Sequence, residues 1–172
     1  MLRRAAILYL AFSSSAVAAE LSDAFGGPVF GVEWGAELDV VRSVHPKGKK
    51  FDSFGVVRYE VRDGRTLFDI ERREKDKITF AFDAEGRLTA IGANFKFSTE
   101  TYGELLTKLK TLFGEYLVVD NESGANIVRW EDESVVLSLA HVPGALSSGN
   151  ISVTIEYSGL EIPQTSAEDL GF

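Results

Sequence analysis

Apolar and polar side chains alternate through most of residues 57–97, which is the period of a β-strand with one buried and one wet face. The dipeptide Asp63-Gly64 interrupts this alternation and has the composition of a tight hairpin turn. Short turn-forming segments separate the later apolar runs in the same way. We therefore predict an antiparallel meander of four strands, which covers residues 57–62, 66–72, 78–82 and 88–97.

The next segment changes to the period of a helix. Apolar residues recur every three or four positions from Tyr102 to Phe113, and they form one stripe that can cover the apolar face of the sheet. Thr101 and Glu104 have the spacing of a capping box at the start of this helix. Gly114 is a typical residue just beyond a helix, so we predict a helix over residues 101–113.

Two further patterns complete the predicted fold. A shorter helical stripe covers residues 38–44 and cannot continue past Pro46. The order helix, four strands, helix, four strands predicts tandem units over about 32–97 and 98–157 in an α+β fold. We expect the strands to form one curved antiparallel sheet with the helices on one face. The strands expected in the second unit cover residues 116–120, 127–131, 135–140 and 151–157.

This order of elements resembles the β-lactamase inhibitor protein fold and related small exported domains, in which tandem helix-plus-sheet units form a curved sheet backed by helices. The phrase Phe30-Gly-Val-Glu-Trp-Gly35 is similar to the openings of exported bacterial domains of this kind. Phe82-Asp-Ala-Glu-Gly-Arg-Leu88 is a hairpin phrase common among them. The resemblance implies a fold and a binding role, and it assigns no functional residue.

Residues 1–19 have the three parts of a secretory signal. They begin with positively charged residues, continue with an apolar run too short to span a bilayer and end with small residues. We expect cleavage near Ala18 or Ala19 and a mature protein in the periplasm. The expected organisation is a signal peptide over 1–19, one α+β domain over 20–157 and a flexible acidic tail over 158–172.

Charge and cysteine content narrow the classes of partner. The chain has no Cys, which favours a bacterial envelope setting and excludes a catalytic thiol and thiolate metal sites. The net charge is −8. From Thr111 onward the chain contains ten acidic residues and a single basic residue, Arg129. This imbalance disfavours nucleic acid and anionic lipid as partners. It suits either docking of a basic envelope protein or simple solubility.

Candidate catalytic chemistry is sparse. His45 and His141 are the only histidines, and no Cys supports them as metal ligands. The chain has no phosphate loop, no dinucleotide-binding glycine motif and no nucleophile elbow. We therefore assign no catalytic residue, no metal ligand and no cofactor.

Five residues remain as candidate binding residues. Glu131, Asp132 and Glu133 place three carboxylates together at an expected hairpin tip, which indicates either a solvated turn or a docking site for a basic partner. Trp34 and Trp130 are large amphipathic rings, and such rings either pack over a core or anchor an interface.

We expect a non-enzymatic exported binding domain, such as a protein inhibitor or an immunity-type protein that acts on an envelope hydrolase or a toxin. The resemblance and the acidic second half favour this reading. The alternative is a periplasmic module that binds a small ligand or peptide or serves envelope maintenance. A deep apolar pocket among Phe80, Phe82, Ile91 and Phe95 would favour that alternative. The patterns leave the oligomeric state open.

Overall fold

The computed structural model describes residues 19–53, 55–119, 124–143 and 149–160. Residues 1–18 of the expected signal and residues 161–172 of the expected tail lie outside this part of the chain. The described elements are, in order, α1 (Leu21–Phe25), α2 (Leu38–Val44), β1 (Lys49–Ser53), β2 (Val56–Arg62), β3 (Lys77–Phe82), β4 (Leu88–Phe95), α3 (Thr99–Phe113), β5 (Leu117–Val119), β6 (Asn126–Glu131), β7 (Val135–Val142) and β8 (Asn150–Tyr157).

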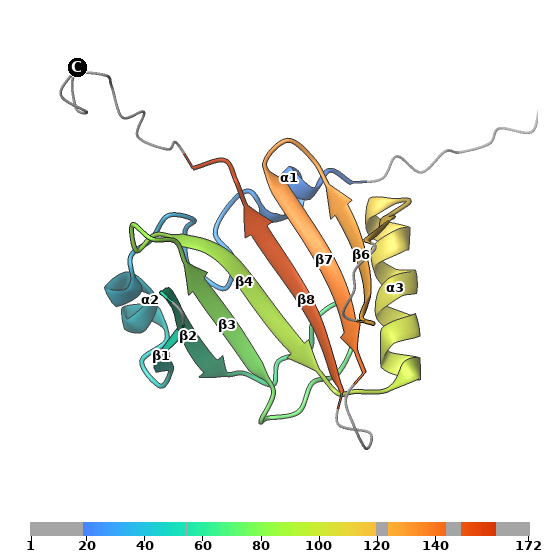
Figure 1. The fold of residues 1–172 in the computed structure, drawn as a ribbon, viewed down its shortest axis with the longest axis horizontal. Coiled ribbons are helices and arrows are strands. Elements are labelled where there is room, and N and C mark those ends of the chain that lie inside the picture. Colours follow the sequence, from blue (N-terminus) through green and yellow to red (C-terminus); the bar gives the residue numbers. More distant parts are fainter. Residues whose placement is uncertain (1–18, 54, 120–123, 144–148, 161–172) are drawn as a thin grey trace, which may run out of the picture.

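The eight described strands form one antiparallel sheet in the order β1-β2-β3-β4-β8-β7-β6-β5. β4 and β8 pair in the middle, so β1 and β5 are the two outer strands. Figure 1 shows the sheet face on, with α3 running beside β6 and α1 near the upper ends of β6 and β7. The predicted α+β class with a mostly antiparallel sheet is confirmed.

The core lies on one face of this sheet because alternate residues of the central strands point the same way. Phe80 is fully buried and lies opposite Ile91, which in turn lies opposite Ile155 and then Leu137. Residues of the opposite face, such as those at 79, 92, 138 and 154, are all partly exposed. The helices add Leu21, Val41, Leu105 and Leu109 to the same buried cluster.

The long helix begins slightly earlier than the capping box predicts. α3 starts at Thr99, and the side chain of Ser98 accepts a hydrogen bond of 3.0 Å from the backbone N–H of Thr101. Ser98 is therefore the N-cap, and Thr101 lies within the first turn. Gly114 ends the helix as predicted, with a φ of 81° that favours glycine. None of the described helices is long and apolar enough to cross a membrane.

The strand predicted over 66–72 and the hairpin turn predicted at Asp63-Gly64 are wrong. β2 pairs directly with β3, and the chain between them is an irregular connection. Phe68 and Asp69 have φ values of 54° and 61°, which break an extended backbone. The alternation of apolar residues in this segment reflects packing against the edge of the core rather than a strand.

A buried arginine fixes this connection to the sheet. The side chain of Arg72 is 0% exposed, and its Nε donates to the carbonyl of Asn94 at 2.8 Å. Its Nη2 donates to the carbonyl of Lys77 at 2.7 Å, and its guanidinium lies 5.4 Å from the ring centre of Phe95. The Asp63 carboxylate, 3.9 Å from Nη1, balances its charge.

The fourth strand of the first half is instead β1, which is not among the strands that the sequence predicts. β1 begins at Lys49 and pairs with β2, with Lys49 opposite Glu60. The residues from Lys49 to Asp52 are all exposed. An outer strand with no buried face carries no apolar alternation, so the pattern cannot reveal it.

Candidate functional site

Trp130 lies in the core rather than at an accessible surface. It is 3% exposed, and its Nε1 donates to the carbonyl of Gly114 at 3.0 Å. The ring of Tyr116 meets it edge on, with 5.5 Å between the ring centres. Trp130 therefore holds the end of α3 against β6 and places the chain that enters β5.

Trp34 is half-buried and joins the segment after α1 to the end of β8. Its Nε1 donates to the carbonyl of Phe25 at 2.7 Å. Its ring stacks on Tyr157 with 5.3 Å between ring centres and 9° between the planes. No described contact joins the two tryptophans, and each is engaged within the fold.

The three carboxylates between β6 and β7 have different roles. Asp132 accepts hydrogen bonds from the backbone N–H groups of Ser22 at 2.6 Å, Val135 at 2.9 Å and Ser134 at 3.1 Å. Burial by itself would raise the pKa of Asp132, but these hydrogen bonds outweigh it and hold the pKa below its ordinary value. Glu131 and Glu133 are exposed on either side. Asp132 is therefore engaged within the fold, and Glu131 lies 4.0 Å from Nη1 of Arg129.

Replacing Asp132 with alanine should lower the free energy of unfolding by about 1–3 kcal/mol at neutral pH, because three backbone donors lose their acceptor. A carboxylate with a lowered folded pKa stabilises the fold above its unfolded pKa and loses that effect as the pH falls through the folded value. Urea melts of wild type and variant should therefore converge in acid. The exposed Glu133→Ala serves as control, and a pH-independent gap for Asp132→Ala would contradict the assignment.

The two histidines lie against aromatic rings in different places. The Nε2 of His45 lies 3.0 Å from the carbonyl of Phe30, and its ring packs against Phe80. The ring of His141 packs against Phe97 and Tyr102, at 5.1 and 5.2 Å between ring centres. Within the described residues, no group of three or more His, Asp or Glu side chains could hold a metal ion.

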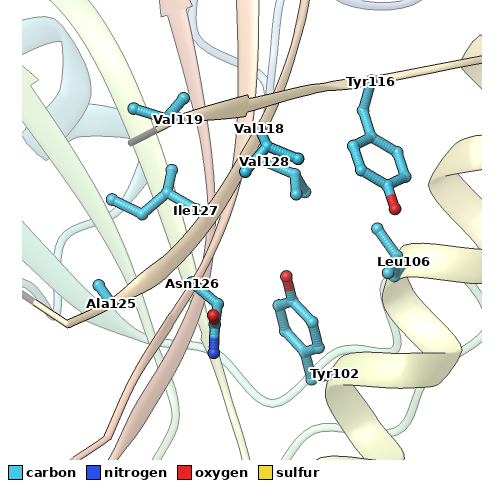
Figure 2. A pocket seen from close by; sticks show the side chains of 9 residues that line it. All are labelled: Tyr102, Leu106, Tyr116, Val118, Val119, Ala125, Asn126, Ile127 and Val128. Atoms are coloured by element: carbon cyan, nitrogen blue, oxygen red, sulfur yellow. The ribbon is translucent and has the colours of Figure 1, made fainter. Parts of the chain in front are cut away.

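An open apolar groove of about 410 Å³ lies between α3 and the outer strands β5 and β6. Figure 2 shows Leu106 on the helix side and Val118 and Val128 on the strand side. The hydroxyl groups of Tyr102 and Tyr116 point into the space between them from opposite ends. Burial, followed by the nearby Tyr116, raises the pKa of Tyr102, so this phenol stays protonated at neutral pH and can donate a hydrogen bond.

Val118 and Leu117 of β5 are the most exposed large apolar side chains of the described chain. Val118 is 76% exposed on the groove side of β5, opposite Val128. Leu117 is 58% exposed and lies opposite Arg129, on the other face of the sheet. β5 is the last strand of the sheet, so no described strand pairs with its outer edge. An outer strand with exposed apolar side chains is a template for pairing with another chain.

Sequence reasoning found the elements around the groove and missed the groove itself. The helical stripe included Tyr102 and Leu106 as residues that cover the sheet, and residues 116–120 were an expected strand. A usable signal was present in Leu117-Val118-Val119. Consecutive apolar residues in a strand place apolar side chains on both faces, so an outer strand of this kind must expose some of them.

The chain matches no protein-family model, no curated protein and no solved structure. The candidate site therefore rests on the geometry of the chain itself.

Proposed function

We propose that this protein is an exported, non-enzymatic binding domain that holds an extended segment of a protein partner along β5. One observation carries the proposal: the outer strand of the sheet exposes apolar side chains on both faces beside an open apolar groove. Val118 and Leu117 are 76% and 58% exposed there. The same edge lies over the groove shown in Figure 2.

The partner segment extends the sheet by one strand. Its backbone pairs with the outer edge of β5, and every second side chain points toward α3. Apolar side chains at those positions enter the groove between Leu106 and Val128. The hydroxyls of Tyr102 and Tyr116 point into the groove and can donate to carbonyl groups of the segment.

An extended protein segment fits this site better than a small molecule in the sheet core. Phe80, Phe82, Ile91 and Phe95 are at most 3% exposed and belong to the filled core, so they line no open site. The groove, by contrast, is open along a strand edge. The proposal of export rests on residues 1–19, and an inhibitor or immunity-type role rests on the resemblance of the element order.

A display library of random peptides tests the proposal. Peptides selected on the purified protein should share alternating apolar residues, since alternate side chains enter the groove. Val118→Asp should weaken the binding of a selected peptide by about tenfold or more, because it places a carboxylate on the apolar rim. The measurement is the Kd of a labelled peptide by fluorescence anisotropy.

Val40→Asp is the matched control, because Val40 is 50% exposed on α2 and the substitution makes the same change in charge. This control should leave the Kd unchanged. The proposed function is wrong if the library yields no enriched peptide, or if both variants lose peptide binding equally. Thermal melts of both variants establish that each one is folded.

A further inference from the structure

Basic side chains without an ion pair gather at the opposite end of the sheet from β5. In the part of the chain that the structure describes, the other basic residues each lie within 4.0 Å of a carboxylate. Seven described basic residues have no carboxylate within this distance. They lie on β1 and β2, just before β1 or β3, or just after β4. They are Lys47, Lys49, Lys50, Arg58, Arg62, Lys75 and Lys96.

Five of these seven side chains line two adjoining clefts, which we call the basic clefts. The first has a volume of about 440 Å³ and is lined by Lys47, Lys49, Phe51, Glu60, Arg62 and Lys77. The second, of about 520 Å³, shares Glu60 and Lys77 with the first and adds Lys75 and Lys96. The two clefts therefore form one elongated surface in a chain whose net charge is −8.

The carboxylates in the basic clefts are already engaged. Glu60 forms an ion pair with Lys77, and Asp76 binds Arg73 with 2.6 Å between Oδ1 and Nη2. The Asp76 side chain is also only 3% exposed. Neither acid is free to neutralise the remaining bases, so the basic clefts present a concentrated positive field to solvent.

The register of β2 and β3 adds an independent observation. Arg62 lies directly opposite Lys77, on the same face of the sheet. Like charges at directly opposite positions destabilise an antiparallel pair, and Glu60 offsets only the charge of Lys77. An anionic group bound between Arg62 and its neighbours would remove this repulsion.

We propose that the basic clefts bind an acidic segment of a protein partner, as an interaction separate from the groove beside β5. Carboxylate side chains of the segment pair with Lys49, Arg62, Lys75 and Lys96, which lie along the two clefts. The exposed ring of Phe51, which is 45% exposed, offers an apolar contact at one end.

The shape of the surface favours a peptide chain over a single small anion or a flat lipid surface. The charges extend over two connected clefts, which is longer than one phosphate or carboxylate group needs. The side chains of Asn94 and Asn150 lie within the second cleft, joined by a hydrogen bond of 3.1 Å. Oδ1 of Asn94 and Nδ2 of Asn150, which this hydrogen bond does not use, can bind peptide backbone. A layer of lipid headgroups offers no such backbone.

Fluorescence anisotropy with a labelled oligoglutamate peptide tests this inference. The purified protein should bind the peptide, and the affinity should fall as salt is added, because screening weakens the attraction. The double variant Arg62→Gln, Lys75→Gln should weaken binding by about tenfold. Its melting temperature should not fall, because the substitution at Arg62 also removes the like-charge pair.

The double variant Lys108→Gln, Lys110→Gln is the matched control, since it makes the same change in net charge on α3. It should change the affinity less than twofold. Equal loss in both double variants would show a general charge effect and overturn the inference. Equally tight binding of an oligonucleotide, or of vesicles of anionic lipid, would also overturn it, because the clefts would then lack preference for an acidic peptide. The groove beside β5 is not involved in any of these outcomes.

Discussion

Replacing Arg72 with methionine should lower the free energy of unfolding by about 3–5 kcal/mol. The guanidinium is fully buried and donates charged hydrogen bonds to the carbonyls of Asn94 and Lys77. Methionine fills a similar volume but leaves these carbonyl groups without this donor. The charge of Asp63 also loses a neighbour 3.9 Å away. The connection between β2 and β3 should therefore detach from the sheet more readily.

Guanidinium chloride melts provide the measurement, with Arg65→Met as the control in the same connection. Arg65 also binds Asp63, but its side chain is 51% exposed, so its loss should cost less than about 1 kcal/mol. If the two substitutions destabilise the protein equally, then Arg72 does not act as a buried clamp. Proteolysis within residues 63–76 should also become faster in the Arg72 variant alone.

Most of the elements that the sequence predicts correctly bury one face. The strands β3, β4 and β8 bury alternate residues over most of their length, and the helix α3 buries one stripe. The period of the apolar residues in the sequence indicates both patterns directly. The segment 66–72 also alternates, but its half-buried side chains only pack beside the core, while Arg72 supplies the contact that fixes it. A side chain that reaches across the fold leaves no local signal.

The candidate site residues also show what a local sequence pattern can and cannot indicate. Residue type identifies Trp130 and Asp132 as capable of binding, but only the fold shows that a Gly114 carbonyl and three backbone N–H groups engage them. Charge counts along the chain draw attention to the acidic second half. Contacts in the fold instead place bases such as Arg62 and Lys96 in adjoining clefts whose own carboxylates are engaged by other bases. Which charges remain available depends on contacts between distant segments, and composition does not encode those contacts.

Replacing Leu109 with alanine should lower the free energy of unfolding by about 2–5 kcal/mol. Leu109 is 0% exposed on the face of α3 that packs over the sheet, so the substitution leaves a cavity. Alanine has a higher helix propensity than leucine, so the loss reflects packing and not a weaker helix.

Leu112→Ala separates these effects within the same helix. The apolar stripe of the sequence includes both leucines, but Leu112 is 37% exposed and Leu109 is not exposed at all. We therefore expect the Leu112 substitution to cost less than about 1 kcal/mol. Urea melts of both variants measure the difference. Equal losses would mean that α3 packs on the sheet through a different face. Because the same helix places Tyr102 and Leu106, the groove that they line would then lose its structural basis.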